Sequence, residues 1–215
     1  MPPRPIVTLH RKINMYDLYK VLDGVPPPPQ SLIDAVDRNR KPTEMEMGYY
    51  YDRNLKNWYD YDFTVSRNRR VVLPGFEEWV TSNLTPHIVD CGVNYARYDE
   101  PSGRPISTGS HTDGVRQYSL MWDIESGGPD AELHFWQEKG YPLYRAPKCQ
   151  GEHRSQLELV DKFRYPTGQW TLIDTRVLHS VENLTSTRIT LHVSLLNDLA
   201  VQTIQGIGEI NFLKG

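Results

Sequence analysis

The chain has 215 residues, 38% of them hydrophobic, and this length fits one domain with a sizeable core. Its formal net charge of -3 gives no general attraction to nucleic acid or to an anionic membrane, so partners of these kinds are not favoured. Two cysteines, Cys91 and Cys149, are too few for a disulfide framework, and no apolar run is long enough to span a membrane. We therefore expect a soluble, cytoplasmic protein.

The first 85 residues predict a helical and aromatic extension that packs on the rest of the chain. Short helices are expected at residues 13–22, 31–38 and 76–80, with polyproline geometry between the first two. Residues 49–63 are densely aromatic and polar. A pair of outer strands that cover the core is the favoured interpretation of this segment, and a platform for stacking a ligand is the alternative.

From residue 88 onward the pattern changes to short strands rich in β-branched and aromatic residues. The polar stretch 145–156 lacks a strand pattern and predicts a long loop, of the kind that often forms a lid. Strands are predicted at 88–98, 118–124, 131–136, 157–160, 169–174, 177–181 and 187–196. Many short strands at close spacing favour a mostly β fold, a sandwich or barrel, with peripheral helices. The expected division is an extension at 1–85, a core at 86–200 and a C-terminal tail at 201–215.

A histidine and a carboxylate two residues apart, His111 and Asp113, are candidate metal ligands. In an extended segment, residues two apart point to the same side, so both can face one ion. A third candidate, His179, lies in a strand-like segment that follows Pro166-Thr167-Gly168. Two imidazoles and one carboxylate on one side of a metal form the facial triad of non-haem Fe(II) oxygenases, which leaves positions open for cosubstrate and oxygen.

Arg188 and Thr190 lie on the next predicted strand and, being two apart, face the same way. His192 has the same parity and is a candidate to line the same pocket. A structural ion pair is the alternative role for Arg188. The acidic residues considered as its partners are Asp174, Glu182 and Asp198.

The order and spacing of these elements resemble the Fe(II)/2-oxoglutarate-dependent dioxygenases, over about residues 89–196. That family has an HxD motif, a distal histidine, and about ten residues later a basic residue, often with Ser or Thr two positions on. The resemblance implies a double-stranded β-helix core, also called a jelly roll and similar to cupins. It also implies that His111, Asp113 and His179 hold Fe(II), and that the cosubstrate's distal carboxylate is bound by Arg188, Thr190 and Tyr98.

The implied activity uses O2 and converts 2-oxoglutarate to succinate while a C–H bond of the substrate is oxidised, with hydroxylation as the default outcome. A small molecule or a protein side chain is the preferred substrate class. Residues near the motifs are candidates for substrate contacts, and these are Trp122, Arg116, Tyr118 and Arg176. For Arg176 a turn position paired with Asp174 is the favoured alternative.

Two rival hypotheses stand beside this one, the first from the same architecture and the second from a different class of protein. A cupin-type metalloprotein without 2-oxoglutarate chemistry is suggested by Pro166-Thr167-Gly168 and by the segment from His179 to Asn183, which resemble the second cupin motif. Against it, the spacing from Gly168 to His179 is too wide, and HxD stands where cupins have HxH. A non-enzymatic β-sandwich binding module is the second rival, with residues 49–63 as its platform.

Overall fold

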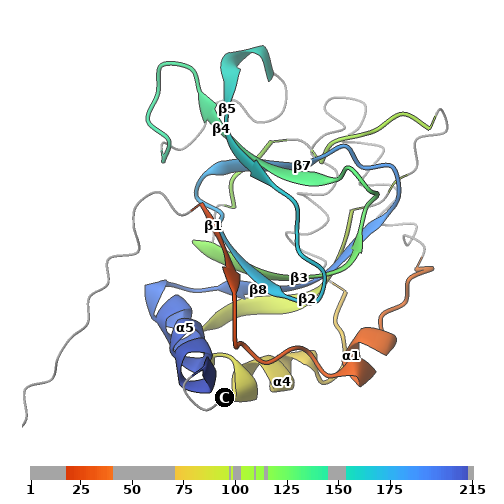
Figure 1. Ribbon diagram of the computed structural model, residues 1–215, viewed down its shortest axis with the longest axis vertical. Coiled ribbons are helices and arrows are strands. Elements are labelled where there is room, and N and C mark those ends of the chain that lie inside the picture. The colour runs from red at the N-terminus through yellow and green to blue at the C-terminus, as the bar shows by residue number, and fades with distance from the viewer. Residues whose placement is uncertain are drawn as a thin grey trace, which may run out of the picture.

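The computed structural model describes residues 18–40, 71–96, 98, 103–108, 110–113, 116–144 and 154–212, with side chains as far as residue 208. Figure 1 shows two facing layers of strands, with the described helices on the outer side of one layer. In chain order the elements are β1 (Tyr19–Leu22), α1 (Gln30–Asp34), α4 (Phe76–Asn83), β2 (Ile88–Ala96), β3 (Tyr118–Ser126), β4 (Glu132–Glu138), the 3-10 turn η2 (Arg154–Gln156), β5 (Leu157–Phe163), β6 (Trp170–Asp174), β7 (Leu178–Glu182), β8 (Arg188–Leu195) and α5 (Asp198–Phe212).

The strands form two antiparallel sheets. The larger has the order β1-β6-β3-β8-β2 and the smaller the order β5-β4-β7. Residues 106–108 and 110–111 run alongside β7 through isolated bridges, Ile106 with Leu184 and His111 with His179, and so extend the smaller sheet. From β2 onward the chain passes back and forth between the two sheets, which is the course of a double-stranded β-helix. The predicted mostly β jelly-roll core with peripheral helices is confirmed.

Strand β8 shows how the two faces of the larger sheet differ. Its odd-numbered residues pack with α4 and α5 in one apolar cluster, and these residues are Ile189, Leu191, Val193 and Leu195. Its even-numbered residues are polar and are also buried, and these are Arg188, Thr190, His192 and Ser194. Because side chains alternate along a strand, the polar set points between the sheets. The inner face of the larger sheet therefore carries polar groups where a simple sandwich would carry apolar ones.

The smaller sheet meets this polar face with apolar side chains. A second cluster joins the two sheets and includes Met121 and Ile173 from the larger one with Leu133, Phe135 and Val181 from the smaller. Phe135 is fully buried and lies directly opposite His179 in the pairing of β4 with β7. The space between the sheets is thus lined by apolar side chains from both sheets together with the polar side chains of β8, the combination that small-molecule sites use.

The N-terminal extension differs from the sequence prediction. Residues 19–22, expected at the end of a helix, form β1, which pairs with β6 at the edge of the larger sheet. The Tyr19 ring stacks on Phe163 of β5, with centroids 3.9 Å apart, so contacts with distant strands decide the local structure. The predicted helices at 31–38 and 76–80 are present as α1 and α4, whereas residues 13–17, 49–63 and 145–153 lie outside the described residues.

The residues expected to form a C-terminal tail are mostly helical. Helix α5 begins at Asp198, where the Asn197 side chain accepts a hydrogen bond from the Ala200 N–H at 3.2 Å, a typical N-cap. Ala200, Val201 and Ile204 are buried against the outer face of the larger sheet. None of the helices in the described part of the chain is long and apolar enough to cross a membrane.

Two glycines allow α5 to lie against the turn that follows β1. Gly24 has a φ of 70°, and a Cβ on it would lie 2.8 Å from the Gly208 carbonyl oxygen. A Cβ on Gly208 would lie 2.6 Å from the Asp23 carbonyl oxygen. Gly206, one half-turn earlier in the same helix, has open space around it. Of the two glycines in α5, Gly208 therefore has no room for a side chain, whereas Gly206 has.

We expect alanine at Gly206 and alanine at Gly208 to shift the free energy of unfolding in opposite directions. Gly208→Ala forces the backbone of Asp23 to move and should lower the free energy of unfolding by about 1–3 kcal/mol. Gly206→Ala should raise it by about 0.5–1 kcal/mol, because alanine loses less backbone entropy in a helix. Urea denaturation of both variants measures the difference. Destabilisation of equal size in both variants would contradict the close contact.

Candidate metal centre

Backbone pairing brings the HxD segment to the distal histidine. The His111 N–H donates to the His179 carbonyl at 3.0 Å, and the His179 N–H donates to the His111 carbonyl at 2.9 Å. Two residues on, the Asp113 N–H donates to the Thr175 carbonyl at 3.0 Å. These bonds fix the backbone on both sides of the site, so the positions of His111, Asp113 and His179 follow from the sheet and not from a free loop.

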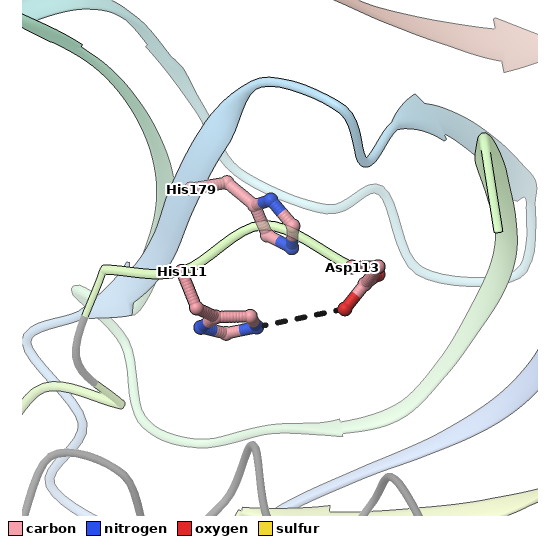
Figure 2. Close-up of side chains that lie close together, drawn as sticks. All are labelled: His111, Asp113 and His179. Atoms are coloured by element: carbon pink, nitrogen blue, oxygen red, sulfur yellow. Dashed lines mark ion pairs between the residues drawn. The ribbon is translucent and has the colours of Figure 1, made fainter. Parts of the chain in front are cut away.

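The three side chains converge on one point (Figure 2). Their potential ligand atoms all lie within 4.8 Å of one another, and His111 Nε2 is 4.0 Å from Asp113 Oδ1. The Asp113 side chain is 5% exposed and that of His111 15%, and His179 is buried. The cluster is therefore closed on the side of the protein interior and more open beside His111.

A hydrogen bond determines which nitrogen His179 offers. Its Nδ1 lies 2.9 Å from the Val177 carbonyl oxygen. A carbonyl only accepts hydrogen bonds, so Nδ1 must carry the proton and donate it. In the neutral ring Nε2 then has the free lone pair, which is the arrangement found when a histidine binds a metal.

Arg116 holds the other oxygen of the Asp113 carboxylate. Its Nε donates to Asp113 Oδ2 at 2.6 Å, and its Nη1 donates to the Ser194 hydroxyl at 3.0 Å on β8. Burial by itself would raise the pKa of Asp113, but Arg116 and the imidazoles of His179 and His111 outweigh it and hold that pKa below its usual value. The carboxylate is thus kept ionised, with one oxygen held by Arg116 and the other turned toward the histidines.

These residues fit a divalent metal ion. The donor set is two imidazole nitrogens and one carboxylate oxygen, all within 4.8 Å of one another. That is the composition of the facial triad of non-haem Fe(II) enzymes. The Val177 carbonyl and Arg116 orient two of the three ligands, as outer-shell partners do in metal sites. The predicted ligands are therefore brought together with the support that such a site needs.

A second group of polar residues lies on the same inner face, at the start of β8. Arg188 is 6% exposed, its Nε is 3.3 Å from Asp123 Oδ1, and its guanidinium carbon lies 4.2 Å from the centre of the Tyr165 ring. Its Nη2 is buried without a hydrogen-bond partner. A buried donor of this kind is costly unless it binds something. Arg188 therefore offers an anchor for an anionic group between the sheets.

Thr190 and His192 lie on the same face, as their parity predicts. Thr190 is 1% exposed and stands opposite Asp123 in the pairing of β8 with β3. His192 Nε2 lies 2.9 Å from the Ser119 hydroxyl, which is also buried. The expected ion-pair partner of Arg188 is corrected: it is Asp123 on the neighbouring strand, whereas the sequence neighbours considered were Asp174, Glu182 and Asp198.

Other candidate residues lie elsewhere. The Tyr98 hydroxyl donates to the Arg104 carbonyl at 3.0 Å, so it is engaged there and not with Arg188. Trp122 packs edge-on against Trp170 in the apolar cluster on the helix side of the larger sheet, the opposite face from Arg188. The structure does not bring Trp122 to the centre, because its parity on β3 is opposite to that of Asp123.

Tyr118 and Arg176 form a separate polar cluster. The Tyr118 hydroxyl donates to Asp198 Oδ1 at 2.9 Å and accepts from Arg176 Nη2 at 3.0 Å. Arg176 also makes two side-chain hydrogen bonds to Asp174, of 2.9 and 2.6 Å. The predicted pairing of Arg176 with Asp174 is therefore present, and both candidates hold the turn between β6 and β7. Of the four substrate candidates, Arg116 alone is in contact with a proposed ligand.

Sequence analysis missed three residues that support the site: Asp123, Tyr165 and Ser194. Asp123 did carry a signal, since it interrupts the apolar strand from Tyr118 to Ile124 with a charge at an inward position. A carboxylate in that place is almost never buried unless it is paired. Nothing in the sequence near Tyr165 or Ser194 indicates their partners, which lie on other strands.

No protein-family model matches the sequence, and no curated protein does either. Solved structures with a similar arrangement include a non-haem α-ketoglutarate-dependent epimerase, SnoN, from nogalamycin biosynthesis (11% identity, 84% of this chain and 78% of that one, TM-score 0.41). They also include the non-haem monooxygenase ThoJ as a nickel complex (11% identity, 84% and 74%, TM-score 0.34). A third is a prolyl-4-hydroxylase from Pseudomonas putida (11% identity, 84% and 93%, TM-score 0.35). Likenesses of this size assign no family to the chain.

We expect the protein to bind one divalent metal ion at this centre. Loss of an outer-shell partner alone weakens metal binding by about 10–100-fold, so His179→Ala, which removes a ligand, should weaken it by at least about 100-fold. His134→Ala is the matched control, because His134 lies on β4 beside Glu132, with 3.2 Å between Nε2 and Oε2, and outside the cluster. Calorimetric titration with Ni²⁺ measures both. Equal affinities in the two variants would show that His179 is not a ligand.

Proposed function

We propose that this protein is an Fe(II)- and 2-oxoglutarate-dependent dioxygenase, which hydroxylates a small molecule or a protein side chain. One observation carries the proposal: the triad of His111, Asp113 and His179 shares the space between the sheets with Arg188, a buried arginine that has an unpartnered Nη2. The triad accounts for a metal, and the arginine accounts for an acidic cosubstrate. A cupin-type metalloprotein accounts for the first feature and leaves the second unexplained.

The residues have separate tasks in this proposal. His111, Asp113 and His179 would hold Fe(II), and Arg188 with Thr190 would bind the distal carboxylate of 2-oxoglutarate. A guanidinium suits this task because its planar N–H groups match the geometry of a carboxylate. The bound iron and cosubstrate supply the oxidising chemistry, in which O2 is consumed, succinate and CO2 are released, and one oxygen atom is transferred to the substrate.

The rest of the chain keeps these groups in place and keeps water away. Arg116 retains one oxygen of Asp113, so the carboxylate has one oxygen left for the metal. The Val177 carbonyl retains the proton on His179 Nδ1. On the neighbouring strand β4 of the same sheet, Phe135 lies with its ring centre 6.5 Å from that of His179 and is fully buried. A buried aromatic ring beside His179 limits the water that can reach this ligand from the side of β4.

Anaerobic addition of Fe(II) and then of 2-oxoglutarate tests the proposed function directly. We expect a weak visible charge-transfer band in the wild-type protein and none in Asp113→Ala, since loss of the carboxylate removes a ligand. In air, the wild-type protein should form succinate. A metal-binding protein that shows neither the band nor succinate would be better described as a cupin-type metalloprotein. A protein that binds no metal at all would favour the non-enzymatic binding module.

The role of Arg188 is tested with Arg188→Lys, which keeps a positive charge beside Asp123, so that this buried carboxylate is not left without a counter-ion. Lysine lacks the planar pair of donors, so the affinity for 2-oxoglutarate should fall by about tenfold or more while Ni²⁺ affinity stays unchanged. Arg164→Lys is the control, because Arg164 is exposed and its contact is a surface ion pair with Asp130. An unchanged affinity for 2-oxoglutarate in Arg188→Lys would show that Arg188 does not bind the distal carboxylate.

A further inference from the structure

Asp123 places a negative charge beside the proposed anchor. It lies on β3 in the row that contains Thr190 of β8 and Asn94 of β2, all on the inner face of the larger sheet. Its Oδ1 is 3.3 Å from Arg188 Nε, and the two side chains are 4% and 7% exposed. With both groups ionised the pair has no net charge. Arg188 together with Asp123 therefore carries no net positive charge that would attract an anion.

Within the described residues, Arg188 and Tyr165 are the charged or titratable groups that face Asp123. Tyr165, from the segment between β5 and β6, lies with its ring against the Arg188 guanidinium. Burial raises the pKa of Tyr165 to about 12, so its phenol is neutral near pH 7. Burial also raises the pKa of Asp123, although Arg188 opposes this shift. A single cation therefore balances Asp123, and a second anion that enters would have no cation of its own.

A cosubstrate carboxylate bound to Arg188 would share one guanidinium with Asp123 in a buried place. Two carboxylates that share such a site do not both stay ionised, because the low dielectric constant strengthens their repulsion, and one of them takes up a proton. The carboxylate that pairs better with the guanidinium keeps its charge. The incoming group has Arg188 Nη2, which is unpartnered, whereas Asp123 has one contact of 3.3 Å to Nε. Asp123 is thus the group that takes the proton.

We propose that Asp123 is a specificity-determining residue that couples binding of 2-oxoglutarate to the uptake of one proton. This inference rests on the proposed function and adds to it a residue that resists a charged distal group. Linkage gives the direction in which the affinity for 2-oxoglutarate changes with pH, because binding of the second carboxylate raises the pKa of Asp123 further. Affinity is then highest at pH values below the pKa of Asp123 in the free protein and falls as pH rises above it. The fall ends once the pH exceeds the pKa in the complex.

The experiment is calorimetric titration of 2-oxoglutarate into the Ni²⁺-loaded protein, in buffers of different ionisation enthalpy, between about pH 5 and pH 8. For the wild-type protein we expect net proton uptake that approaches one per ligand, and an affinity that falls by up to about tenfold for each pH unit. Asp123→Asn keeps the shape of the side chain and removes its charge. Binding of 2-oxoglutarate to this variant should be accompanied by no net proton uptake, and its affinity should depend little on pH. At the upper end of the pH range the variant should bind 2-oxoglutarate more tightly than the wild-type protein does.

Asp130→Asn is the matched control, because Asp130 is an acidic residue with 80% of its side chain exposed. It should behave as the wild-type protein does. Wild-type binding without proton uptake would overturn the inference and leave the proposed function standing, as would weaker binding by Asp123→Asn across the whole range. Absence of 2-oxoglutarate binding in every protein would overturn both. If Asp123→Asn does not fold, the proton count of the wild-type protein decides the question.

Discussion

Two backbone hydrogen bonds between His111 and His179 hold together segments that are far apart in the sequence, and the geometry of the proposed site depends on them. They align residues 110–111 with the start of β7, and the alternation of side chains then directs Asp113 toward the same point. Because the bonds belong to a sheet that is anchored further along by Ile106 and Leu184, the ligands do not rely on a loop for their positions. A site built on strands can hold its ligands in place before a metal arrives.

The same alternation determines what faces those ligands. On β8 it sends one set of residues into the apolar cluster with the helices and the other set, all polar, between the sheets. Burial of so many polar groups is unfavourable for folding unless each of them is bonded. Most are bonded: Ser194 accepts from Arg116, and His192 is joined to Ser119. Arg188 Nη2 is an exception, and it lies where the proposed function requires a donor. Sites where local rules are broken in this way are often functional ones.

The cluster of His111, Asp113 and His179 was predictable because its signal is local and ordered: two residues spaced for one side of a strand, then a histidine, then a basic residue. The order of the strands was predictable only through the resemblance, since every pairing in the larger sheet joins segments distant in sequence. Tyr19–Leu22 was predicted as a helix because a four-residue strand has too few positions to show its period. Helix α5 did have a signal, Asn197 followed by apolar residues at helical spacing, but Gly206 and Gly208 weaken it. The pairing of Asp123 with Arg188 had no signal of its own, because an ion pair between strands depends on register.

The contact between Gly24 and Gly208 has a consequence for the order of folding. It joins the turn after the first described strand to the last described helix, so it can form only when nearly the whole described chain is present. The packing of α5 against this turn is therefore one of the last contacts that becomes available while the chain is being synthesised. Contacts of such long sequence separation form slowly, because the entropy of closing the loop is lost before the contact is gained. Until then Ala200, Val201 and Ile204 have not covered their part of the outer face of the larger sheet, and exposed apolar surface of this kind favours association with other chains.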